Sequence, residues 1–314
     1  MPNWKEVLEE IQGEISSGNQ TALDTVRRKY IAEVYKKTGR NVIAYYSGWL
    51  QRPASGEVII NDKDKNALMV NIHKLDRTKG LDLILHTPGG DLAATESIVD
   101  YLYSMFGRDI RAIIPQISMS AGTMIALACK EIMMGKQSNL GPIDPQMGGV
   151  ACKGVLDEFE QAKSDIKSNP ASAPLWQVIV SKYHPTFLGA CQNSIEWSEI
   201  LAEEWMKRNM CNGDEAKAKK ILKEIGDHKS NKSHSRHISK DKCREIGISI
   251  VDMETDNDLQ DLILTVHHAF MHTFASSMAT KIVENHLGTA FVEQIPLQFQ
   301  PQQFQMPNAL PLNT

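Results

Sequence analysis

The sequence predicts an α/β protein built on a parallel sheet, with helices connecting successive strands. Short apolar segments alternate with segments of helical periodicity between residues 41 and 134. The connections are short, which favours βαβ units whose helices cover the sheet. Paired glycines follow one of these strands and a Ser-Ala-Gly sequence follows another, at the ends where parallel sheets collect ligand sites.

The N-terminal part of the chain is predicted to be helical before the sheet begins. Residues 1–40 carry apolar residues at helical spacing on both sides of a Ser-Gly-Asn sequence. A run of strands and helices follows, which we assign to a core of residues 41–151. The expected strands are 41–46, 81–85, 110–114 and 131–134, and the expected helices are 62–75, 91–106 and 121–129.

The C-terminal half divides by composition. Residues 152–228 have a helical pattern and are predicted to be a helical insertion, and residues 229–255 complete the core after a polar loop. Apolar residues at helical spacing predict a C-terminal helix over 256–292. The Gln/Pro-rich residues 293–314 predict a disordered tail.

Composition excludes several classes of protein. The chain has 314 residues with 34 Lys and Arg against 38 Asp and Glu, a net charge of −4, which argues against nucleic-acid binding as the main function. Five cysteines without a CxxC pair suit reduced thiols in the cytoplasm. The longest uncharged stretch outside the tail, 112–129, contains Pro, Gln, Ser and Gly residues, so we expect no membrane span.

Two turns carry the candidate chemistry. His86-Thr87-Pro88-Gly89-Gly90-Asp91 places paired glycines between a strand and a helix, where backbone N–H groups favour negative charge. The functional interpretation is an oxyanion hole or phosphate cradle, and the alternative is a tight turn that needs glycine. Ser118-Met119-Ser120-Ala121-Gly122-Thr123 places Ser120 at the start of an apolar helix. Ser120 is either an exposed nucleophile or a helix N-cap.

The segments HTPGGDLAATESIVDYLY and ISMSAGTMIALACKEIMMGKQSNLGPIDPQ resemble serine peptidases of the Clp/crotonase fold. They are most similar to the serine dehydrogenase proteinase (SDH) family, which is related to the signal peptide peptidase A group. The resemblance covers residues 41–150, with a second patch at 238–248. The order of PGG, SAG and LGPIDPQ makes it specific, and no GxGxxG follows a strand.

The resemblance implies a serine peptidase that cuts peptide bonds through an acyl-serine intermediate. Ser120 matches the family nucleophile, and the N–H groups of Gly90 and Ala121 match the oxyanion hole. Asp144 matches the aspartate and His234 the histidine of a Ser-Asp-His triad. Such a histidine takes the serine proton, and the aspartate orients and stabilises the imidazolium. No metal or organic cofactor is implied.

Other bases remain open from the sequence. His237 stands close enough to His234 to compete for the role of base. The signal peptide peptidase A group uses a Ser-Lys dyad, and Lys153 and Lys163 lie where such a lysine would fall; a buried lysine can act as a base because burial lowers its pKa.

The same fold also serves other classes of function. A catalytically silent scaffold and an acyl-CoA-binding protein are the alternatives to a peptidase. Relatives assemble as rings or stacked trimers, so we expect a homo-oligomer, with the apolar stripes of residues 1–35 and 256–284 as candidate subunit surfaces. We expect a peptide or protein substrate and leave room for a partner regulator. His268 and His272 have a metal-binding spacing without the HExxH motif and are assigned a structural role.

Overall fold

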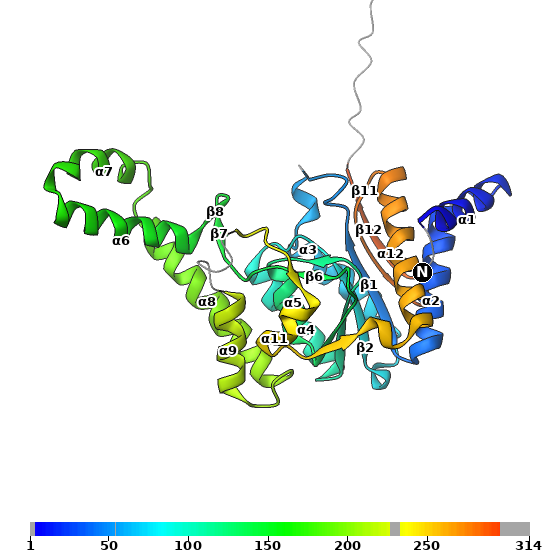
Figure 1. Cartoon of the computed structure of the whole chain (residues 1–314). Coiled ribbons are helices and arrows are strands. Elements are labelled where there is room, and N and C mark those ends of the chain that lie inside the picture. The colour runs from blue at the N-terminus through cyan, green and yellow to red at the C-terminus, as the bar shows by residue number, and fades with distance from the viewer. Residues whose placement is uncertain (1–3, 54, 227–232, 296–314) are drawn as a thin grey trace, which may run out of the picture.

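The computed structural model describes residues 4–53, 55–226 and 233–295 (Figure 1). The helices are α1 (Trp4–Ser16), α2 (Ala22–Thr38), α3 (Lys63–Ile72), α4 (Leu92–Phe106), α5 (Ala121–Ala128), α6 (Cys152–Ser168), α7 (Ala173–Val180), α8 (Phe187–Arg208), α9 (Glu215–Ile225), α11 (Lys240–Ile246) and α12 (Asn257–Ser276). The strands are β1 (Asn41–Ser47), β2 (Leu81–His86), β3 (Ile110–Ile114), β4 (Ile117–Ser118), β5 (Glu131–Met134), β6 (Asn139–Leu140), β7 (Gln146–Met147), β8 (Val150–Ala151), β9 (Ile238–Ser239), β10 (Ile250–Asp252), β11 (Ala279–Asn285) and β12 (Ala290–Gln294).

A seven-stranded sheet forms the centre of the molecule, in the order β10-β5-β3-β2-β1-β11-β12. The five strands from β10 to β1 run parallel, in a register that pairs Tyr46 of β1 with His86 of β2. The strands β11 and β12 add antiparallel pairs beyond β1. The predicted α/β class with a mostly parallel sheet is therefore confirmed.

Helices cover both faces of the sheet, which explains why its strands are apolar without alternation. Along β1, Ile43 and Tyr45 pack into a core shared with α3, α4 and α5, whereas Val42, Ala44 and Tyr46 pack into a second core with α2 and α12. Figure 1 shows these two helical layers on opposite sides of the sheet.

A charge inside the sheet is compensated locally. Asp82 of β2 is fully buried, and its carboxylate accepts hydrogen bonds from the guanidinium groups of Arg40 at 2.8 Å and Arg111 at 2.7 Å. A buried charge is tolerated only when it is paired in this way. The strand therefore keeps one acidic residue in an otherwise apolar run.

Two further regions frame the carboxyl end of the sheet. A small sheet of β4, β6 and β9 lies beside it, with β4 parallel to β6 and β9 antiparallel to β6. The helices α6, α7 and α8 form an arm that projects from the body of the molecule (Figure 1). Its base is fixed because Leu201, Trp205 and Met206 of α8 are buried in the core that contains α5.

The C-terminal helix expected over 256–292 is wrong in its second half. The helix α12 ends at Ser276, and β11 and β12 then form a hairpin in the central sheet. The turn of this hairpin contains Gly288 at φ +81, a conformation that glycine adopts without strain. Lys281 and Glu284 are fully buried in β11. Because charged residues are unusual in a strand interior, the sequence of this segment did not indicate a strand. The expected tail also begins later, since β12 includes residues 293 and 294, and 296–314 lie outside the described residues.

The N-terminal and C-terminal apolar stripes face each other inside the chain. Val7 and Ile11 of α1 and Val26 of α2 form one buried cluster with Ala269 of α12. These residues of the stripes are therefore covered within the chain, whereas Trp4 and Ile15 of α1 and Met278 after α12 are 46%, 57% and 44% exposed. The use of the stripes as subunit surfaces stays a prediction. His272 in the same region contacts the carbonyl of Trp4 at 3.1 Å through its Nε2 atom.

The burial of His86 predicts that the free energy of unfolding decreases at acidic pH. Burial lowers the pKa of His86 from 6.5 to about 4, because the protonated ring is poorly solvated inside the protein. Below about pH 6.5 the unfolded chain binds this proton and the folded chain does not, so the unfolding free energy decreases by about 3 kcal/mol as the pH falls to about 4. Urea unfolding at several pH values measures this loss.

The variant His86→Leu should lose less stability than wild type across that pH range, since it has no proton to take up there. His73→Leu changes an exposed histidine and should follow wild type. Equal pH dependence in wild type and His86→Leu would contradict the assignment.

Candidate active site

The turn after β2 is held by a segment from elsewhere in the chain. Ile60 forms a parallel bridge to Gly90: its N–H donates to the carbonyl of Gly89 at 2.8 Å, and its own carbonyl accepts from the N–H of Asp91 at 2.9 Å. Successive residues of an extended chain point their N–H groups to opposite sides. The N–H of Gly90 therefore faces away from Ile60, and Gly90 lines a cleft.

Ser120 lies at a sharp turn between β4 and α5. Its backbone has φ 51 and ψ −117, a region that residues other than glycine rarely adopt. Its side chain makes no capping hydrogen bond, so the N-cap alternative is not supported. The side chain is partly exposed and lines the same cleft as Gly90. A strained turn between a strand and a helix likewise exposes the serine hydroxyl in the nucleophile elbow of α/β-hydrolases.

The two turns are hydrogen-bonded to each other. The N–H of Met119 donates to the carbonyl of Thr87 at 3.0 Å, and Thr87 and Ser118 form a parallel bridge. The approach is close enough that a Cβ atom on Gly89 would lie 2.7 Å from the carbonyl oxygen of Met119 and 2.8 Å from Cβ of Ser120. Glycine is thus required at position 89 both by space and by its φ of +96.

Two backbone donors remain available at this junction. Among the residues that the structure describes, the N–H groups of Gly90 and Ala121 donate no hydrogen bond. Ala121 is the first residue of α5, where helix N–H groups lack partners inside the helix and the dipole favours negative charge. Both residues line the cleft together with Ser120.

The pairing of β6 with β9 brings Asp144 near His234. Leu140 of β6 is opposite Ile238 of β9 in an antiparallel register. Asp144 lies four residues after Leu140, and His234 lies four residues before Ile238. Because the two segments run antiparallel, both residues lie on the same side of this pair and equally far from it along the chain. The distance from His234 Nδ1 to Asp144 Oδ2 is 3.9 Å, and the side chains are 28% and 6% exposed. In the described part of the chain no hydrogen bond joins Ser120 to His234.

The cleft has a volume of about 290 Å³ and a largely apolar lining. Apart from the glycine, serine and alanine already described, its walls are formed by Asp91, Leu92, Met124, Ile143, Asp144, Pro145, Gln146, Met147, Ser194, Trp197 and Ser198. The last three belong to α8 in the arm and were not predicted. Their spacing of three and four residues places them on one face of the helix, a signal that the sequence alone did not connect to the cleft.

The structure places the alternative bases away from this cleft. His237 lines a separate pocket with Glu224, Arg236 and Lys242. Lys153 lines another pocket with Glu199 and Lys219. Lys163 is 71% exposed and pairs with Glu160 at 2.5 Å.

Comparison with known protein families identifies the family of the chain. The model of the family described as ClpP-like SDH-type serine proteinases matches residues 17–273. The chain belongs to this family. The resemblance drawn from the PGG, SAG and LGPIDPQ sequences is thereby confirmed, and so is the fold class that it implies.

Two relatives of this chain come from Methanocaldococcus jannaschii, and both are uncharacterized proteins. MJ1495 is 29% identical over 229 residues, which are 71% of this chain and 71% of the relative. MJ0137 is 32% identical over 148 residues, 46% of this chain, and this match spans about half, 51%, of the relative's length. Among the residues that the structure describes, none of the helices is both long and apolar enough to cross a membrane.

Replacement of Gly89 should distort the junction between the two turns. We expect Gly89→Ala to lower the unfolding free energy by about 3 kcal/mol, because the strain of a positive φ adds to the clash with Met119 and Ser120. Gly39→Ala is the matched control, since Gly39 has the left-handed conformation φ 69 and ψ 4, with no atom within 4 Å of the position that a Cβ would take. It should lose only about 1 kcal/mol. Urea unfolding compares the two variants, and equal losses would show that the Gly89 contact is unimportant.

Proposed function

We propose that the protein is a serine peptidase in which Ser120 forms an acyl-enzyme intermediate. One observation carries the proposal: a partly exposed serine at a strained turn shares a cleft with two backbone N–H groups that have no partner in the described part of the chain. Donors fixed in this way stabilise the oxyanion of acyl transfer. Membership in a serine proteinase family supports the same reaction.

His234 is the proposed base and Asp144 the residue that orients it. Nδ1 of His234 faces Asp144, which leaves Nε2 for the serine proton. Oγ of Ser120 attacks the peptide carbonyl as His234 accepts its proton, and the carbonyl oxygen becomes an oxyanion bound by the N–H groups of Gly90 and Ala121. Collapse of this intermediate releases the amine, which takes the proton from His234. A water molecule then repeats the sequence and frees Ser120.

The gap of 3.9 Å between His234 Nδ1 and Asp144 Oδ2 exceeds a hydrogen bond. Catalytic hydrogen bonds commonly shorten when substrate binds. We therefore expect substrate binding to bring the His234 ring within hydrogen-bond distance of Asp144.

The cleft favours a peptide over an acyl-CoA. Its lining is apolar with Asp91 and Asp144 as its charged side chains. A coenzyme with several phosphates would meet like charge there, whereas an apolar side chain of a peptide fits the walls formed by Leu92, Met124 and Trp197. A peptide or protein substrate is therefore proposed, with no cofactor in the reaction.

Reaction with a fluorophosphonate probe tests the proposed nucleophile. We expect one adduct on Ser120, found by intact mass and peptide mapping, and none on Ser120→Ala. His234→Ala should lower the labelling rate at least 100-fold, because a serine hydroxyl is a weak nucleophile without its base. His237→Ala is the matched control and should label like wild type. Absence of an adduct and of peptide hydrolysis on folded protein would favour the catalytically silent scaffold.

We further propose that the protein acts in the cytoplasm as a homo-oligomer. All five cysteines are free, which suits a reducing compartment. The helix α7 has no buried residue although it is rich in apolar side chains, and Leu175 and Val178 are 64% and 61% exposed. Exposed apolar patches of this kind mark contact surfaces, here for a second copy or a regulatory partner.

Charges on α7 should separate the subunits. We expect wild type to be larger than a monomer in size-exclusion chromatography with light scattering. Leu175→Glu combined with Val178→Glu should dissociate it, because burying a carboxylate without a partner is unfavourable. Ile15→Glu on the exposed side of α1 is the control and should leave the assembly intact. A strictly monomeric wild type would overturn the proposed assembly.

A further inference from the structure

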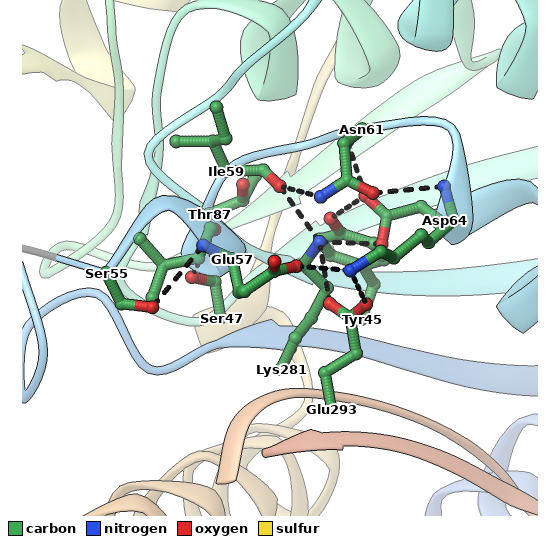
Figure 2. Close-up of polar contacts among 12 residues, drawn as sticks. Tyr45, Ser47, Ser55, Glu57, Ile59, Asn61, Asp64, Thr87, Lys281 and Glu293 are labelled. Carbon is green, nitrogen blue, oxygen red and sulfur yellow. Dashed lines mark hydrogen bonds and ion pairs between the residues drawn. The ribbon is translucent and has the colours of Figure 1, made fainter. Parts of the chain in front are cut away.

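The residues that hold Ile60 belong to a buried polar network outside the cleft (Figure 2). Lys281 of β11 and Asp64 of α3 are both fully buried, and Lys281 Nζ lies 2.8 Å from Asp64 Oδ1. Tyr45 of β1 donates its hydroxyl to Asp64 Oδ2 at 2.8 Å. Burial raises the pKa of Tyr45 well above its usual value, so this hydroxyl keeps the proton that it donates.

Both charges of the buried pair contact the backbone on either side of Ile60. Lys281 Nζ donates to the carbonyl of Ile59 at 2.8 Å. Asp64 Oδ2 accepts from the N–H of Asn61 at 2.9 Å. Figure 2 shows these two contacts converging on the segment from opposite ends of the ion pair. A further bond, from Ser47 Oγ to the carbonyl of Val58 at 2.7 Å, holds the same segment one residue earlier.

The segment thus has two sides with different partners. The backbone groups of Ile59 and Asn61 face the ion pair, whereas those of Ile60 face Gly89 and Asp91. This alternation is a property of extended chain. The ion pair therefore sets the position of Ile60, and Ile60 sets the direction in which Gly90 points its N–H.

Stability alone is a poor explanation for this pair. Desolvation of two buried charges offsets most of their attraction, and apolar replacements of such pairs are often neutral or stabilising. The pair also orients the backbone, because the ammonium binds the carbonyl before Ile60 and the carboxylate binds the N–H after it. The hydroxyl of Tyr45 in turn holds the carboxylate of Asp64.

We propose that Lys281 and Asp64 are positioning residues that act through Ile60 to fix the Gly90 N–H as an oxyanion donor. The proposal rests on the function proposed above for the Ser120 cleft. Neither residue touches the cleft, and their effect is on the alignment of one donor. Loss of this alignment should weaken binding of the tetrahedral intermediate while leaving substrate binding nearly unchanged.

The main test removes both charges together. Lys281→Met with Asp64→Asn removes both members of the fully buried pair, and Glu293, which lies 3.4 Å from Lys281, keeps Lys63 as its partner at 3.5 Å. We expect the rate of fluorophosphonate labelling at Ser120 to fall about 10- to 100-fold. This loss of rate is no greater than the loss caused by removing an oxyanion donor altogether. For a hydrolysed peptide, kcat should fall by a similar factor and KM should stay within about twofold.

Two further variants separate alignment from folding. Lys63→Met removes an exposed lysine that pairs with Glu57 and also reaches Glu293 at the rim of the network, and it should label like wild type. Tyr45→Phe keeps both charges and removes one hydrogen bond to Asp64, so a loss of about two- to fivefold is expected. Near-ultraviolet circular dichroism establishes that each variant is folded.

The outcomes distinguish this inference from the proposed function. If wild type forms no adduct at Ser120, the proposed function fails. If wild type reacts and the folded double variant reacts equally fast, only the positioning role is overturned. If the double variant does not fold, Tyr45→Phe decides, and an unchanged labelling rate in Tyr45→Phe overturns the role.

Discussion

The candidate site depends on hydrogen bonds between backbone segments at the carboxyl ends of the central strands. Thr87 is bonded to Met119, and Gly89 is bonded to Ile60, so both turns are fixed by main-chain contacts. These contacts determine which way the N–H groups of the neighbouring residues point. Donors aligned before substrate arrives need no reorganisation during reaction, which is the main source of their catalytic value.

Local signals were sufficient to predict four of the parallel strands and both turns. Apolar runs marked β1, β2, β3 and β5, and the glycine pair and the Ser-Ala-Gly sequence marked the strand ends that line the cleft. Asp144 and His234 came from the resemblance to a family instead. Their proximity follows from the pairing of two short strands, β6 and β9, and a pairing between two-residue strands leaves no periodicity to detect.

Features that depend on distant contacts could not be predicted. The strand β11 contains a buried lysine and a buried glutamate, which are unusual in a strand interior and are compensated by Asp64 and Arg27. Those partners lie far away in the sequence. In the same way, the apolar stripe of α1 gave no sign that α2 and α12 would cover it, and the helix face of α8 gave no sign that it forms a wall of the cleft.

The place of β11 in the sheet has a consequence for synthesis of the chain. β11 is the last strand to pair with β1, although β1 is the first strand made. A growing polypeptide already contains Ser120, Asp144 and His234 well before Lys281 leaves the ribosome. With the ammonium absent, the carbonyl of Ile59 keeps only the longer hydrogen bond from Asn61 Nδ2 at 3.3 Å, and Asp64 lacks the counter-charge of Lys281. Under the proposed function, a chain that has not yet added β11 holds Ser120, Asp144 and His234 without the ion pair that positions Ile60, so the order of synthesis would delay peptide cleavage until β11 joins the sheet.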